Sequence, residues 1–160
     1  MSVKSIKNMS ASVHDRLLDI ARRDKRTFNE ILQYFALERF LYRWSISPSS
    51  KLFILKGALM LRVWKVTEFR PTLDIDLLGK NTKSDLELIA TNIKQIILVK
   101  VENDGISFDP DSVTATNITE DADYEGVRVN FRGYLGTAII PMQVDIGFGD
   151  SPLWQTISIL

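Results

Sequence analysis

Two aspartates, Asp74 and Asp76, lie one residue apart in the apolar run 73–78. If this run is a strand, both carboxylates point to one face and the alternating leucines and isoleucine point to the other. Like charges this close repel each other, and an apolar strand carrying both is unfavourable unless a cation or hydrogen-bond donors balance them. The pattern therefore predicts a site for a divalent cation, Mg2+ (or Mn2+).

An upstream segment, residues 52–64, has a pattern that predicts a phosphate-binding turn. It reads as an apolar strand that breaks at Lys56, Gly57 and Ala58 and resumes with helical spacing. Backbone N–H groups at the start of a helix, with little side-chain bulk beside them, form a site for phosphate oxygens. We expect this turn to hold the phosphates of a nucleoside triphosphate while the acids hold the metal.

A third acid, Asp145, lies in another alternating run between the apolar residues Val144 and Ile146. It is a candidate ligand of a second metal ion, or a candidate acceptor for the proton of an attacking hydroxyl.

Each of these residues also has a purely structural interpretation. An isolated Asp-x-Asp pair on a half-exposed strand is more often a surface feature than a ligand set. The apolar surroundings, the preceding turn and the third acid favour the ligand interpretation here. Lys56 could instead be a strand-end charge and Arg62 an exposed helix residue, although both are candidates to bind the nucleotide.

The ordered set of Gly57 and Ala58, a helix, residues 70–76 and residues 143–150 resembles the nucleotidyltransferases of the AbiEii/AbiGii toxin family. The N-terminal residues 12–43 are also similar to that family's leading helices, so the resemblance covers nearly the whole chain. Asp74, Asp76 and Asp145 match the family's metal acids, Thr72 matches a hydroxyl residue that often precedes them, and Gly57 and Ala58 stand at its phosphate turn.

This resemblance implies a DNA polymerase-beta-like nucleotidyltransferase core that uses a nucleoside triphosphate with Mg2+. It further implies a toxin of the abortive-infection, toxin–antitoxin type with a protein antitoxin as partner. In studied members of the family the acceptor is sometimes a tRNA end. The family usually continues into a helical half that carries an Arg-x-Lys-Asp-like segment, which this sequence lacks. We therefore expect one nucleotidyltransferase-like domain over 1–160, with N-terminal helices in 1–48, a catalytic-type core in 51–160, and a shortened C-terminus.

Composition narrows the remaining possibilities. The chain has no cysteine and one histidine, His14, which excludes disulfides, thiol catalysis and ordinary structural zinc sites. Its opening is too polar for a signal peptide, and Lys56 interrupts the longest apolar stretch, so we expect a cytoplasmic protein without a membrane span.

Up to Arg70 there are 14 basic residues against 6 acids, and beyond it 6 against 14. The basic half could contact RNA, or could be ordinary solvated helix faces.

The elements that position these residues follow from periodicity and turn signals, and together they predict an α+β fold. The resemblance implies that the helices pack on a nucleotidyltransferase-like mixed sheet, preceded by two N-terminal helices. Ser12 is a possible cap for a helix reaching about Arg26, and Thr27 with Glu30 forms a capping box for a second helix. The remaining expected elements are a helix over 83–100, a turn-rich segment over 104–111 that contains Pro110, a weak strand over 113–118, and a hairpin of 126–132 and 137–145 joined by 133–136. Pro141 predicts a sheet edge or bulge early in the second hairpin strand.

The leading hypothesis is thus a metal-dependent enzyme that joins a nucleoside monophosphate to an acceptor hydroxyl and releases pyrophosphate. The alternative is a non-catalytic module that binds nucleic acid or an antitoxin and retains a vestigial nucleotide site.

Overall fold

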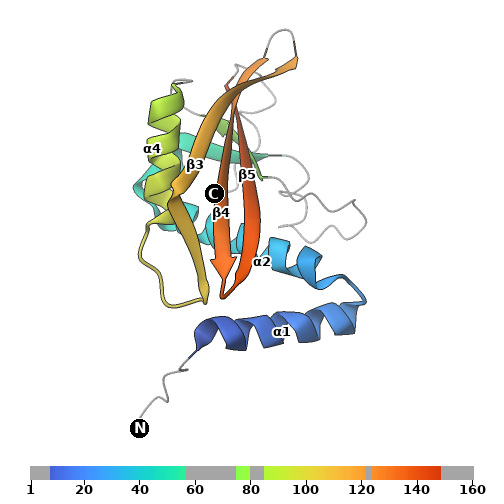
Figure 1. The fold of residues 1–160 in the computed structure, drawn as a ribbon. Helices are drawn as coiled ribbons and strands as arrows, with labels where there is room; N and C mark the ends of the chain where they lie inside the picture. The colour runs from blue at the N-terminus through green and yellow to red at the C-terminus, as the bar shows by residue number, and fades with distance from the viewer. Residues whose placement is uncertain (1–7, 57–74, 80–84, 122–123, 149–160) are drawn as a thin grey trace.

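A computed structural model describes residues 8–56, 75–79, 85–121 and 124–148 of the 160-residue chain (Figure 1). These ranges contain three α-helices, one short 3-10 helix and five strands, which confirms the α+β class. In chain order the elements are α1 (Met9–Asp24), α2 (Phe28–Ile46), η1 (Pro48–Leu52), β1 (Phe53–Lys56), β2 (Ile75–Gly79), α4 (Leu86–Ile97), β3 (Ile106–Asp121), β4 (Tyr124–Leu135) and β5 (Ala138–Phe148).

Side-chain caps set where the helices begin. The Thr27 hydroxyl accepts a hydrogen bond from the backbone N–H of Glu30 (3.2 Å), which confirms the predicted start of α2. Asp85 caps α4 in the same manner, accepting from two backbone N–H groups. The expected Ser12 cap of α1 is wrong. Asn8 caps the helix instead, because its side chain accepts from the backbone N–H of Ala11 (3.0 Å) one turn earlier.

The five strands form one mixed sheet in the order β1-β2-β5-β4-β3. Strands β2 and β5 are parallel, and the other neighbouring pairs are antiparallel. Strand β5 therefore lies in the middle of the sheet, with β2 on one side and β4 on the other. Its early part pairs only with β4 among the described strands, since β2 begins opposite Val144. Pro141 accordingly occupies a local edge, where its missing N–H breaks no ladder bond.

Strands β3, β4 and β5 are longer than the sequence pattern suggested. The segment 106–111, expected to be turn-rich, belongs to β3, and the register shift between Asp109 and Thr114 accommodates Pro110 as an irregularity. The turn between β4 and β5 is also tighter than expected. It consists of Gly136 and Thr137, with Gly136 at φ +59°, a left-handed conformation that glycine adopts without strain.

The core lies between the sheet and helices α2 and α4. One face of the central strands contributes fully buried aliphatic side chains, and α4 lies along β3 (Figure 1). Phe40 of α2 packs against Phe108 of β3 and Phe131 of β4, with ring centroids 5.6–6.5 Å apart. Helix α1 crosses the turn end of the sheet, where the Ser10 hydroxyl donates to the Gly105 carbonyl oxygen (2.7 Å). The sheet face opposite the core is therefore the one that can present polar side chains.

Candidate active site

A row of charged residues crosses four adjacent strands of the sheet. Lys56 of β1 stands opposite Asp76 of β2, Asp76 stands opposite Asp145 of β5, and Asp145 stands opposite Arg128 of β4. Residues in direct register on neighbouring strands point to the same face, so Asp76, Asp145 and Arg128 lie on one side of the sheet. The geometry brings together Asp76 and Asp145 from segments far apart in the sequence.

The local sequence explains why both acids face away from the core. Asp76 lies between Ile75 and Leu77, and Asp145 lies between Val144 and Ile146, and all four of these apolar residues are completely buried. Because side chains alternate along a strand, burying the apolar residues against the helices fixes the carboxylates on the opposite face. Asp76 is half-buried there, whereas Asp145 is only 6% exposed.

Asp145 is held by a bidentate ion pair with Arg128. The guanidinium donates from Nε to Oδ1 (2.9 Å) and from a terminal nitrogen to Oδ2 (3.0 Å). Buried carboxylates require such partners, and a forked arginine satisfies both oxygens at once. The Arg128 side chain is 41% exposed, so this ion pair bridges a buried acid and the surface.

Arg128 was not among the residues singled out from sequence. The signal that identifies it is the register of the hairpin, since counting back from the turn at Gly136 and Thr137 places Arg128 opposite Asp145. The expected four-residue turn gave no such register, because a hairpin's register depends on the length of its loop.

Several predicted site residues lie outside the described ranges. These are the phosphate-turn residues, the residues assigned to nucleotide binding further on, and the first acid of the pair, namely Gly57, Ala58, Arg62, Thr72 and Asp74. The backbone of Lys56 ends β1 directly opposite Asp76. The roles of all these residues stay predictions.

The residues present fit a magnesium or manganese ion. Mg2+ prefers oxygen ligands and is commonly held by one or two carboxylates together with substrate phosphates and water. Asp76 and Asp145 supply two carboxylates on one face of adjacent strands. No group of three acidic, histidine or cysteine side chains gathers among the described residues. Asp74, two residues before Asp76, stays the predicted third carboxylate.

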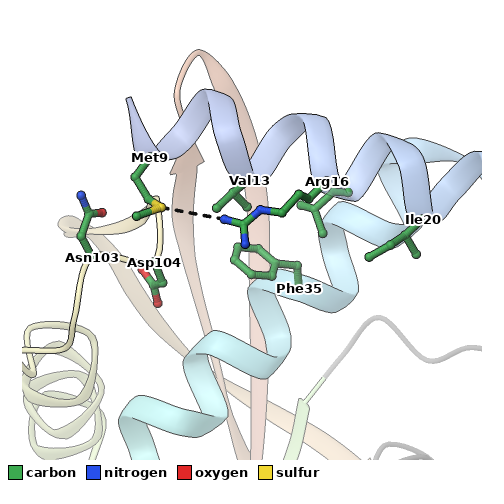
Figure 2. Close-up of a pocket in the computed structure, with 8 residues that line it drawn as sticks. Met9, Val13, Arg16, Ile20, Phe35, Asn103 and Asp104 are labelled. Atoms are coloured by element: carbon green, nitrogen blue, oxygen red, sulfur yellow. Dashed lines mark hydrogen bonds between the residues drawn. The ribbon is translucent and has the colours of Figure 1, made fainter. Parts of the chain in front are cut away.

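A separate hollow of about 510 Å3 lies between α1, α2 and the segment before β3 (Figure 2). Figure 2 shows Val13, Arg16 and Ile20 of α1 facing Phe35 of α2, with Asp104 on the other side. This hollow is at the turn end of the sheet, whereas Asp145 lies roughly 20 Å further along β5. It is thus distinct from the row of charged residues, and its lining is mainly apolar.

Several basic residues of the two N-terminal helices and of the turn between them contact nearby acids. Arg23 contacts Asp24, Arg26 contacts Glu30 and Arg39 contacts Glu38. The hydrogen bond to Asp24 raises the pKa of Arg23, and the one to Glu38 raises the pKa of Arg39. Arg43 is buried and forms a bidentate pair with Asp104 (2.9 and 3.1 Å). Much of the positive charge on these two helices and the turn between them is therefore balanced locally, which favours the interpretation as ordinary helix faces.

Comparison with known proteins gave two matches. The family model of the nucleotidyl transferase AbiEii toxins of type IV toxin–antitoxin systems matches residues 39–159. Among solved structures, the crystal structure of JHP933 from Helicobacter pylori is similar with a TM-score of 0.50 and 12% sequence identity. That similarity covers 84% of this chain and 50% of the other, so this chain spans about half the length of the protein it matches. At this identity the similarity concerns the fold alone.

Two further observations are negative. A search of curated protein sequences gave no match. Within the described ranges no helix is both long and apolar enough to cross a membrane.

Proposed function

The chain belongs to the AbiEii family of nucleotidyl transferase toxins of type IV toxin–antitoxin systems, and we propose that it transfers a nucleoside monophosphate from a nucleoside triphosphate to an acceptor hydroxyl. The acceptor hydroxyl gives up its proton, for which Asp145 is the candidate acceptor, and its oxygen attacks the alpha-phosphorus. The bond from the alpha-phosphorus to the oxygen that bridges it to the beta-phosphate breaks, and pyrophosphate leaves. We further propose that the acceptor is RNA, with tRNA the first candidate, and that a protein antitoxin opposes the activity in the cytoplasm.

The observation that carries this proposal is the register of Asp76 against Asp145 on the parallel strands β2 and β5. Strand pairing fixes the spacing of the two Cα atoms, and the fully buried aliphatic neighbours of each acid keep both acids on the same face of the sheet. A rigid pair of oxygen donors is what a metal-dependent transfer requires, because catalysis of this kind depends mostly on positioning and charge.

Asp76 and Asp145, with Asp74, would hold Mg2+ (or Mn2+). When bound, this ion supplies positive charge that stabilises the phosphate oxygens during transfer. The chain's own residues orient the substrates. In this proposal the backbone at Gly57 and Ala58 holds the terminal phosphates, and Lys56, Arg62 and Thr72 contact the nucleotide.

The test is a transfer assay with Mg2+, each of the four labelled ribonucleoside triphosphates in turn, and total tRNA. We expect label to move to RNA, and we expect Asp145→Asn to reduce the rate by at least about 100-fold, as for loss of a group acting in the transition state. Asp111→Asn, an exposed acid on β3, is the matched control and should leave the rate unchanged. Equal rates for the chain and for Asp145→Asn would contradict the proposal.

One observation favours a second function. Both oxygens of Asp145 already accept hydrogen bonds from Arg128, so the acid is balanced without a metal. A module with a vestigial nucleotide site that binds an antitoxin or nucleic acid would show this arrangement permanently. It would give no transfer with any nucleotide, and its binding to a partner would be insensitive to Asp145→Asn.

A further inference from the structure

We propose that Arg128 is a displaceable internal cation of the nucleotide site. It balances Asp145 while the site is empty, releases this acid when metal and nucleotide bind, and then contacts the phosphates. This inference rests on the proposed function, because it assigns a role to Arg128 at the same site.

The bidentate geometry is the first support. Both oxygens of Asp145 are engaged by the guanidinium at 2.9 and 3.0 Å. A cation that binds Asp145 must therefore share these oxygens with Arg128 or replace it. Sharing is unfavourable, because it would bring a divalent ion and a guanidinium to within a few ångströms of each other.

The difference in exposure between the two partners is the second support. The Asp145 side chain is 9% exposed and sits on the central strand, whereas the Arg128 side chain is 41% exposed. Of the two, only Arg128 can turn towards solvent without leaving a buried position. A long, flexible side chain that carries a permanent charge is suited to leave one anion and engage another nearby.

The order of the charged row gives the third support. Asp145 lies between Asp76 on β2 and Arg128 on β4. Strands are about 4.8 Å apart, so Arg128 stays within reach of anything bound to the two acids after it releases Asp145. A planar guanidinium matches the oxygens of a phosphate group as well as those of a carboxylate. The triphosphate would thus replace the anion that Arg128 loses.

The proposed displacement predicts that loss of Arg128 changes metal affinity and nucleotide affinity in opposite directions, which a merely structural role would not produce. Arg128→Gln should bind Mn2+ alone roughly tenfold more tightly than the unsubstituted chain, because a competing positive charge is removed. With saturating Mn2+, the same variant should bind ribonucleoside triphosphates roughly tenfold more weakly, because a phosphate contact is lost. Titration calorimetry and the electron paramagnetic resonance signal of free Mn2+ measure both quantities without turnover.

Arg132→Gln is the matched control. Arg132 lies on the same strand and the same face as Arg128, but it faces Asp109 (3.8 Å) and not the acids of the row. Its variant should bind Mn2+ and nucleotide like the unsubstituted chain. Arg128→Lys keeps the charge with a single point contact, so it should raise Mn2+ affinity by less than Arg128→Gln and retain most of the nucleotide affinity. If circular dichroism shows that Arg128→Gln is unfolded, Arg128→Lys takes its place in the Mn2+ and nucleotide titrations.

The outcomes separate this inference from the proposed function. Mn2+ affinity that is unchanged or lower in folded Arg128→Gln and Arg128→Lys overturns the inference while leaving the metal site intact. Tighter Mn2+ binding with unchanged nucleotide affinity would show that Arg128 does not contact the phosphates. If neither the chain nor its variants bind Mn2+, both the inference and the proposed metal site are wrong.

Discussion

Asp76 and Asp145 stand directly opposite each other on the adjacent parallel strands β2 and β5. If they hold one ion, their contributions to its binding are coupled. We expect Asp76→Asn and Asp145→Asn each to weaken Mn2+ binding by at least about tenfold, and the double substitution to add little beyond the larger single effect. Calorimetry on the four proteins of this cycle measures the coupling. Fully additive losses would indicate that the acids contribute to ion binding independently, and unchanged Mn2+ affinity in both single variants would show that neither acid binds the ion.

Arg43 and Asp104 form a buried ion pair between α2 and the segment before β3. Their side chains are 5% and 11% exposed, and the guanidinium also lies over the ring of Phe108. Replacing Arg43 by Met leaves a nearly buried carboxylate beside Arg39 alone, so we expect the free energy of unfolding to fall by about 3–5 kcal/mol. Urea denaturation measures this loss. The double variant Arg43→Met, Asp104→Leu should be less destabilised than Arg43→Met alone. A double variant that is less stable than Arg43→Met would contradict the role given to this ion pair.

Ile89 and Leu88 are neighbours on α4 with opposite environments. Ile89 is completely buried against the sheet, whereas Leu88 is 44% exposed. We expect Ile89→Ala to lower the free energy of unfolding by about 2–5 kcal/mol, because it removes buried methyl groups and leaves a cavity. Leu88→Ala should stay within about 0.5 kcal/mol of the unsubstituted chain. Guanidinium denaturation of the two variants side by side checks which face of α4 packs on the sheet.

The Thr27 side chain caps the start of α2, because its hydroxyl accepts a hydrogen bond from the backbone N–H of Glu30. We expect Thr27→Ala to lower the free energy of unfolding by about 1 kcal/mol, since one backbone donor loses its partner. Thr27→Ser keeps the hydroxyl and should be nearly neutral. Thermal unfolding followed by circular dichroism compares the three proteins. An equal loss for both variants would mean that the methyl group of Thr27 matters and not the cap.

The sequence predicted the fold class, the cap of α2 and the alternation around Asp76 and Asp145, because each depends on local periodicity or on a local hydrogen bond. It missed the length of β3 and the tight turn after Leu135. Pro110 and the pair of glycines at 133 and 136 suggested breaks, but pairing with a long partner strand outweighed these weak local signals.

The candidate site could be predicted only in part. The acids were identified from apolar neighbours that force them onto one face. The place of β5 between β2 and β4 could not be read from the sequence, since strand order depends on long-range pairing. Arg128 was missed for this reason, because its partner is known only once the hairpin register is known.

The position of β5 also affects how the chain forms during synthesis. It follows the other four described strands in the chain, yet it joins β2 to the β3–β4 pair in the middle of the sheet. A nascent chain interrupted before residue 138 therefore contains Asp76 but lacks the strand that holds Asp145 beside it. Because the ribosome delivers this central strand after its neighbours, unfinished copies of the proposed toxin would be inactive in the cell that translates them.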